Sequence, residues 1–343
     1  MKRGDRMSSK VTMRDIAREM GVSAVTVSKA ISGKDGVGSE LRAAIIRRAE
    51  EMGYVYKPGS SSAGKSDLKS NIGIVVAERF VSDDAFYTKL YRAVLMSAAE
   101  KGFSAILEIV TRECEEQCVI PNIVRDNKVD GIIFLGQIKR DYIVSVVSSG
   151  LPFVFLDFYD DKYLDDSVVT DNQHGAYILA KHLIEKGHRR IGFVGSVAMT
   201  SSILDRYLGV YKALLKNGFR MEGNWLLEDR TDDGKLLEKF EIPKGDMPDA
   251  FVCNNDQTAL RLVNQLKAEG YSVPGDVSVV GFDDHVYASM CNPPLTTYRV
   301  DMQSMADAAV SIMIRKIKGK RCAKGMTSVS GSLIERDSVA DRS

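Results

Sequence analysis

The chain has 343 residues, of which 44% are hydrophobic and 27% charged, proportions typical of a globular protein with more than one domain. No apolar run reaches the ~18 residues of a membrane span, and the polar start MKRGDRMSSK lacks the apolar segment of a signal peptide, so we expect a cytoplasmic protein without a membrane partner. Lys and Arg exceed Asp and Glu by 13 to 7 in residues 1–65, whereas acidic residues exceed basic ones by 39 to 34 in the remainder. A basic N-terminal segment on a slightly acidic body suits a nucleic-acid-binding head.

Residues 11–32 predict two short helices joined by a tight turn. Thr12 can cap the first helix, with Asp15 completing a capping box. Gly21 is expected in the left-handed conformation that ends a helix, and Ser23 is expected to cap the second helix. This is the pattern of a helix-turn-helix, whose second helix enters the major groove of DNA. The alternative is an ordinary helical hairpin in a protein core.

The second helix presents small and polar side chains outward, with Val27 and Ile31 expected to face inward. Ala24 and Val25 can touch a thymine methyl, and hydroxyl groups nearby can reach phosphate oxygens. A third helix is expected from Ser39 to Gly53, after the flexible loop 33–38. One face of this third helix carries Leu41, Ile45, Ala49 and Met52. We therefore predict a three-helix headpiece over residues 10–56.

A linker over residues 57–70 follows the headpiece, because YVYKPGSSSAGKSDLKS is rich in Gly, Ser and Lys. From residue 71 onward, apolar strands alternate with helices, which predicts an α/β core of doubly wound parallel sheets in two similar halves. Strands are expected at 72–77, 104–110, 130–135, 152–157, 168–171, 190–196, 249–254, 277–282 and 327–334. Helices are expected at about 86–101, 113–126, 139–149, 172–186, 202–217, 256–269 and 301–318.

Polar side chains follow several of the predicted strands. Asp157, Asn255 and Asp283 come after strands, and Arg206 opens the helix at 202–217. Because ligands bind beyond the carboxyl ends of parallel strands, these groups are candidates for holding the hydroxyls of a polyol or the edges of a base in a cleft. Helix capping is the alternative role for each of them taken alone.

These stretches together resemble the LacI/GalR family of bacterial transcription regulators. The resemblance runs from Val11 to Ile334 and rests most strongly on the helix-turn-helix and on GHRRIGFVGS. The other matching stretches are AEEMGYVYKP, VDGIIFLG, DRYLGVYKALLKNG, CNNDQTAL and SVPGDVSVVGFDDH followed by PPLTT.

The resemblance implies a homodimer that binds a pseudo-palindromic operator in double-stranded DNA, usually as a repressor. It also implies a periplasmic-binding-protein-like core over 71–334, with one subdomain at 71–168 plus 299–334 and a second at 169–296. A small effector, most simply a sugar or sugar derivative, would bind in the cleft between them and change their angle. By position, the implied DNA-binding residues are Thr12, Ser23, Ala24, Val25, Thr26, Ser28 and Lys29, and the implied effector-binding residues are Phe86, Asp157, Arg206, Asn255 and Asp283.

The chain departs from the family at the hinge. Members usually carry a short helix there, ending in a leucine that wedges into the minor groove and kinks the DNA. This chain has PGSSSAGK at 58–65, a poor helix former without a leucine. Lys29 also stands where an arginine is common, and it lacks the planar fork that reads guanine. We therefore expect the groove-reading helix to supply more of the sequence specificity.

Other functions fit the sequence less well. GSSSAGKS at 59–66 fits the letters of a P-loop, but it follows a helix and leads into a strand, the reverse of the required context. No histidine or cysteine spacing suggests a metal site, and we expect no catalytic residue, no metal and no cofactor. A solute-binding protein or a cleft enzyme is disfavoured. A nucleoside-type ligand or a protein partner in place of a sugar stays open.

Overall fold

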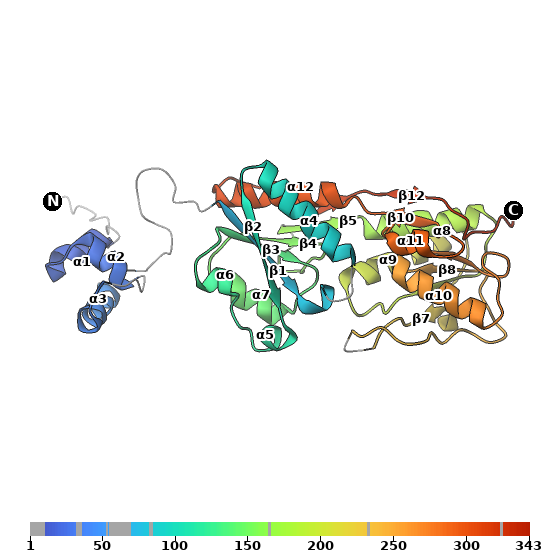
Figure 1. Ribbon diagram of the computed structural model, residues 1–343, viewed down its shortest axis with the longest axis horizontal. Helices are drawn as coiled ribbons and strands as arrows, with labels where there is room; N and C mark the ends of the chain where they lie inside the picture. Colours follow the sequence, from blue (N-terminus) through green and yellow to red (C-terminus); the bar gives the residue numbers. More distant parts are fainter. Residues whose placement is uncertain are drawn as a thin grey trace, which may run out of the picture. The chain divides into compact units, whose positions relative to one another are not determined.

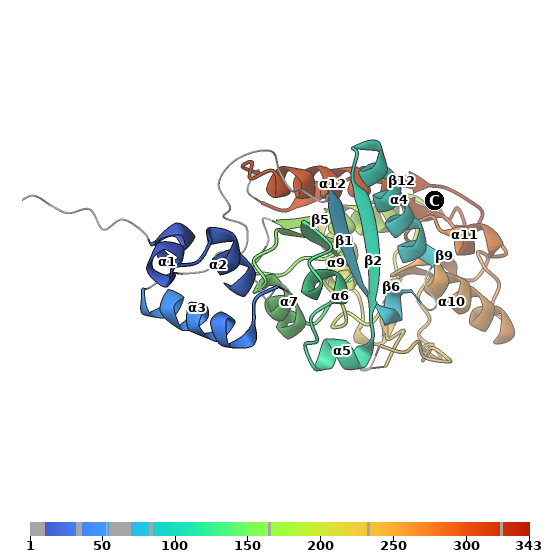
Figure 2. The same ribbon diagram turned by 60° about the vertical axis from the view of Figure 1, so that its left-hand side comes forward.

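The computed structural model describes residues 11–31, 36–52, 54, 70–81, 85–163, 166–231, 234–322 and 325–343. Its contacts divide the chain into two compact units, one ending at Asp67 and the other running from Leu68 to Ser343. Figures 1 and 2 show three helices in the first unit and the sheets in the second. No helix in the described part is long and apolar enough to cross a membrane. The PGSSSAGK segment and Gly53, the expected end of the third helix, lie outside the described residues.

The first unit contains α1 (Met13–Met20), α2 (Ala24–Ile31) and α3 (Ser39–Glu51). The predicted capping box is confirmed, since the Asp15 amide donates to Thr12 Oγ1 and the Thr12 amide donates to Asp15 Oδ2. Gly21 follows α1 at φ 64°, a left-handed conformation that glycine adopts without steric cost. The Thr26 amide donates to Ser23 Oγ at 3.0 Å, so Ser23 caps α2 as expected.

Six buried side chains form the core of the three helices: Ile16, Ala17, Val27, Ala30, Ile45 and Ala49. Ile31 is partly buried and packs against this core as expected, and Ala30 also lies inward beside Val27. Leu41, expected on the same face of α3 as the core residues, is instead 39% exposed, whereas Ile45 and Ala49 are buried.

The second unit begins with a six-stranded sheet in the order β11-β5-β4-β3-β1-β2, with all neighbours parallel. Its alternating side chains meet two helical layers, as the pleat of a strand requires. Ile72 and Ile74 of β1 pack into the core cluster that holds α4 and α12, whereas Val75 packs into the one that holds α7. The strands are β1 (Asn71–Ala77), β2 (Ser104–Val110), β3 (Gly131–Leu135), β4 (Phe153–Leu156), β5 (Ser167–Thr170) and β11 (Thr327–Val329), and the helices are α4 (Ala85–Glu100), α7 (Arg140–Val147) and α12 (Met302–Ile317).

The single helix expected at 113–126 is wrong. The chain forms two short helices there, α5 (Arg112–Glu116) and α6 (Asn122–Arg125). Cys118 has a left-handed backbone, with φ at 54°, and Pro121 precedes α6. A proline lacks the amide that a continuous helix would need at that position, so the chain turns and restarts.

The second sheet has the order β7-β6-β8-β9 and is also parallel throughout. Helices α8 and α9 pack with their backbones close together at Gly209. A Cβ at this position would lie 2.1 Å from the Gln173 carbonyl oxygen, so the contact requires glycine. The strands are β6 (Ile191–Val194), β7 (Leu226–Leu227), β8 (Ala250–Cys253) and β9 (Ser278–Val280), and the helices are α8 (Asn172–Glu185), α9 (Ser201–Lys216), α10 (Asp256–Ala268) and α11 (Val286–Met290), with 3-10 turns η1 (Glu78–Phe80) and η3 (Gly223–Trp225).

The chain passes between the two sheets three times. The single strand expected at 327–334 is wrong, because the chain makes its third passage within these residues. They are divided between β11 in the first sheet and β12 (Ser332–Ile334), which pairs antiparallel with β10 (Thr297–Arg299). Residues 335–343 then run along the second sheet, where the Val279 amide donates to the Ser338 carbonyl at 3.0 Å. Figure 1 shows the C-terminal end at this second subdomain.

Candidate functional site

Helix α2 presents the side chains that the sequence assigns to DNA. Val25 is 64% exposed, and Lys29 is exposed on the following turn. Ser23 and Thr26 share a hydrogen bond of 2.8 Å between their hydroxyls, so the cap also orients both oxygens. Thr12 is exposed at the start of α1, where its hydroxyl donates to Asp15. Ala24 and Ser28 are partly buried on the same helix.

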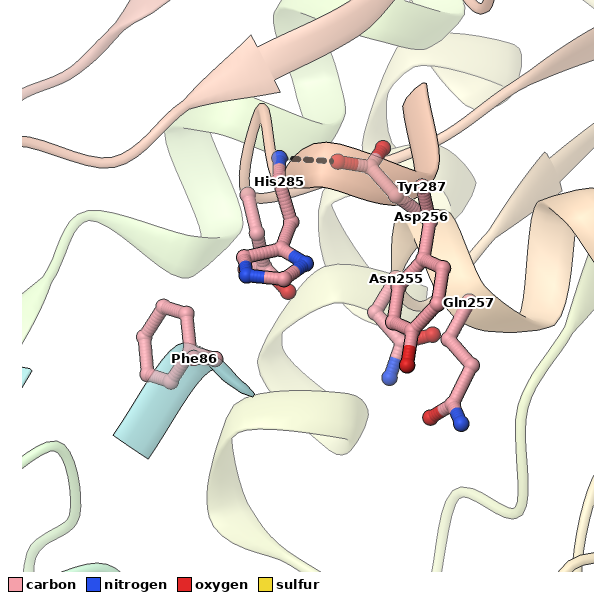
Figure 3. Close-up of a pocket in the computed structure, with 7 residues that line it drawn as sticks. Phe86, Asn255, Asp256, Gln257, His285 and Tyr287 are labelled. Atoms are coloured by element: carbon pink, nitrogen blue, oxygen red, sulfur yellow. Dashed lines mark hydrogen bonds between the residues drawn. The ribbon is translucent and has the colours of Figure 1, made fainter. Parts of the chain in front are cut away.

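A pocket opens in the second unit between its two subdomains. Figure 3 shows Phe86, at the start of α4 in the first subdomain, on one side and Asn255, His285 and Tyr287 of the second subdomain on the other. It encloses about 210 Å³ of empty space, including the part open to solvent. The structure thus brings together three of the five predicted effector residues. The full lining is Phe86, Asn255, Asp256, Gln257, Asp283, His285 and Tyr287.

Arg206 lies just behind this pocket and holds Asp283 in place. Its Nη2 is 3.3 Å from Asp283 Oδ1, and its Nε donates to Asn172 Oδ1 at 2.8 Å. Its Nη1 donates to the Asn254 carbonyl, and its guanidinium carbon lies 3.8 Å from the ring centroid of Phe282. With Arg206 only 6% exposed, this side chain orients Asp283 and does not line the pocket.

Asp157 lies apart from the pocket wall. The Tyr87 hydroxyl donates to Asp157 Oδ2 at 2.8 Å, and Tyr87 follows Phe86 in the first turn of α4. Asp157 and Asp283 share an unusual backbone, with φ at 69° and 106° respectively. Positive φ costs a non-glycine residue energy, and such residues gather at binding and active sites. Asp157 therefore occupies a strained position directly after β4, and Asp283 occupies one three residues beyond the end of β9.

Two side-chain contacts connect the subdomains beside the pocket. Gln137 follows β3. Its side-chain amide accepts a hydrogen bond from the Ser201 backbone N–H at 3.0 Å and donates one to the Met199 backbone carbonyl at 3.4 Å. The Tyr159 hydroxyl donates to Asp205 at 3.3 Å. An effector that changes the spacing of the subdomains would have to alter these contacts.

Sequence reasoning missed three residues of the pocket lining: Gln257, His285 and Tyr287. Tyr287 belongs to α11, a five-residue helix that no periodicity predicts, and His285 immediately precedes that helix. Asp284, adjacent to Asp283, instead pairs with Arg299 and Arg336 and serves to bind the crossing strands to the second subdomain.

Asp256 forms the floor of the pocket and should give the core a pH-dependent stability. Burial raises the pKa of Asp256 from 3.8 to about 7, although hydrogen bonds from Thr297 and His285 oppose the shift. Because the folded form holds its proton more tightly, the stability contributed by protonated Asp256 is complete below about pH 4 and is lost as the pH rises to about 7.

Asp256→Asn should remove this dependence, since an amide can still accept from His285 and can donate to Thr297. The measurement is the free energy of unfolding in urea at several pH values between 4.5 and 8. Native protein should lose stability relative to the variant across that range. Parallel curves for the two proteins would contradict the assignment.

Two family models match the chain in the order that the fold requires. Residues 12–56 match the lacI family of bacterial regulatory proteins, and residues 180–339 match a periplasmic binding protein-like domain. The chain belongs to the lacI family. It is a DNA-binding transcriptional regulator with an effector-binding core, and not an enzyme.

Relatives and solved structures of this family align over nearly the whole chain. The transcriptional repressor PurR of Photobacterium profundum is 26% identical over 96% of this chain and 99% of its own length. The structure of the transcriptional regulator CelR–cellobiose complex is 26% identical, covers 96% of this chain and 100% of its own, and gives a TM-score of 0.69. The Lac repressor bound to ONPG in its repressed state is 25% identical, covers 96% and 100%, and gives a TM-score of 0.67.

Proposed function

We propose that this lacI-family regulator is a homodimeric repressor that reads a pseudo-palindromic operator with α2. Val25 and Lys29 reach the base edges with Ala24, and the hydroxyls of Thr12, Ser23, Thr26 and Ser28 contact phosphates. The exposure of Val25 on a helix whose Val27 is fully buried supports this orientation. Because Ala24 and Val25 offer only methyl groups, sequence reading would depend on thymine methyls and on Lys29.

We further propose that the effector is a sugar or sugar derivative bound in the pocket lined by Phe86, Asn255 and Asp283. The observation that carries this is the strained, Arg206-held carboxylate of Asp283 at the pocket wall. A fixed carboxylate and an amide accept and donate hydrogen bonds to hydroxyl groups, and an aromatic ring covers the apolar face of a sugar ring. The relative of known structure bound to cellobiose supports the same ligand class.

The second candidate ligand is a nucleoside. Tyr287 and His285 are tilted at 53° with their ring centroids 5.2 Å apart, and Phe86 lies across the pocket. Three rings around one pocket would suit the stacking of a nucleobase better than a small polyol.

A thermal-shift panel of mono- and disaccharides, nucleosides and free bases tests these assignments. We expect a sugar to raise the Tm of the native protein and to have no effect on Asp283→Asn, because a ligand stabilises only the form that binds it. Asp284→Asn, which alters the adjacent carboxylate outside the pocket lining, is the matched control and should keep the shift. A shift with nucleosides alone would favour the second candidate, and no shift with any compound would favour a protein partner.

A further inference from the structure

We propose that a second hollow, in the first subdomain, binds a small uncharged apolar molecule that carries a hydrogen-bond acceptor. This hollow lies between the end of β2 and the segment that joins α5 to α6. It shares no residue with the pocket at Asp283 and encloses about 350 Å³ of empty space, including its opening. Its lining is Glu108, Ile109, Val110, Cys114, Val119, Ile120, Pro121, Asn122 and Tyr142.

The walls of the hollow are mostly apolar. Ile109 and Val119 are 46% and 42% exposed at its rim, although both are large hydrophobic residues. Behind them, Val110 and Tyr142 belong to the buried core cluster on this face of the first sheet. The segment between α5 and α6 supplies Val119, Ile120 and Pro121 to this wall.

Tyr142 supplies an unsatisfied polar group. Its side chain is fully buried on α7, and its hydroxyl has no hydrogen-bond partner among the described residues. A buried hydroxyl without a hydrogen-bond partner destabilises the folded protein. A ligand that accepts a hydrogen bond from Tyr142 would remove this destabilisation, which a purely hydrocarbon ligand could not.

The charge of the wall selects against anions. Glu108 uses its carboxylate within the chain, accepting from the Asn122 amide at 2.6 Å, from Asn122 Nδ2 at 2.9 Å and from the Ile123 amide at 2.8 Å. It is thus unavailable as a partner for the ligand, and its negative charge would repel a carboxylate or phosphate nearby. Burial is the main cause that raises the pKa of Tyr142, and the negative charge of Glu108 is the second. The Tyr142 hydroxyl therefore stays protonated and acts as a donor.

A small aromatic ring with a short substituent matches the chemistry of the mostly apolar lining. A neutral aromatic ketone combines such a ring with one acceptor, and acetophenone is therefore the probe of choice. Ethylbenzene has nearly the same shape without the acceptor, and benzoate adds the negative charge.

The experiment titrates the full chain with each probe, with binding followed by protein NMR. We expect saturable binding of acetophenone, weaker binding of ethylbenzene and none of benzoate. Tyr142→Phe should weaken the binding of acetophenone by about three- to tenfold and leave the binding of ethylbenzene unchanged. The substitution removes one hydrogen bond and leaves the aromatic ring in place. The Tm of Tyr142→Phe should equal or exceed that of the native protein, because the lost hydroxyl has no partner.

Two valine variants test the location. Val119→Trp fills the rim and should abolish binding of both neutral probes, whereas Val144→Trp, at a valine that is 41% exposed on α7 and outside the hollow, should leave binding intact. The proposal is overturned if acetophenone does not bind the native protein, or if Tyr142→Phe binds it as tightly as the native protein does. It is also overturned if the Tm of Tyr142→Phe is lower than that of the native protein, or if Val119→Trp still binds the probes. None of these outcomes depends on the effector at Asp283.

Discussion

Replacing Arg206 with methionine should lower the free energy of unfolding of the core by about 3–5 kcal/mol and abolish any effector response. Methionine keeps an unbranched side chain, but it removes every donor and the guanidinium that lies over the Phe282 ring. Asp283 would then keep a nearly buried carboxylate, 11% exposed, without its cationic partner. Asn172 and the Asn254 carbonyl would lose their donor as well. The loss therefore reflects uncompensated polar groups more than a lost attraction.

The measurement is urea unfolding followed by the fluorescence of Trp225, the single tryptophan, which is buried in the second subdomain. Arg206→Lys is the milder control, because it keeps the charge but not the three-way hydrogen bonding. Combining Arg206→Met with Asp283→Asn should restore part of the stability by removing the unpaired charge. A loss under about 1 kcal/mol in Arg206→Met would show that the pair does not hold the site together.

Val27→Ser should unfold the headpiece and abolish operator binding while leaving the core folded. Val27 is fully buried between the three helices, so serine removes apolar contacts and buries a hydroxyl, at about 2–4 kcal/mol. A headpiece of about 45 residues has little stability to lose. Because the headpiece and the core form separate compact units, unfolding of the first need not spread to the second.

Val25→Ser is the matched control on the same helix. Val25 is 64% exposed, so the change should leave headpiece stability within about 0.5 kcal/mol and weaken operator binding by about 1 kcal/mol through a lost methyl contact. Hydrogen exchange over residues 11–52 reports folding, and anisotropy with a duplex selected in vitro by the native protein reports binding. Equal effects of Val27→Ser and Val25→Ser on headpiece stability and operator binding would contradict the assigned orientation of α2.

The helix-turn-helix could be predicted closely because its signals are local. A capping box, a glycine at the helix end and a three- to four-residue apolar spacing each act within one or two turns, and the structure confirms all three at Thr12, Gly21 and Ile16. The strands β1 to β6, β8 and β9 were also predicted well, since a buried parallel strand is a continuous apolar run, whereas β7 and β10 were not predicted. The prediction for Leu41 was wrong because the length of a contact between two helices depends on how they are placed relative to each other. The spacing of apolar residues along one helix does not determine that placement.

The sequence by itself determined which side chains stand near the strand ends, because Asp157, Asn255 and Asp283 each follow an apolar run. Only the tertiary structure decided what each of them does. Asp283 and Asn255 meet Phe86 across the subdomains, Arg206 is withdrawn behind the pocket, and Asp157 is paired with Tyr87. The division of residues 327–334 between two sheets was likewise decided by distant partners, β5 for residues 327–329 and β10 for residues 332–334. Pairing over such distances depends on the closure of the whole core, and no local signal in the chain carries it.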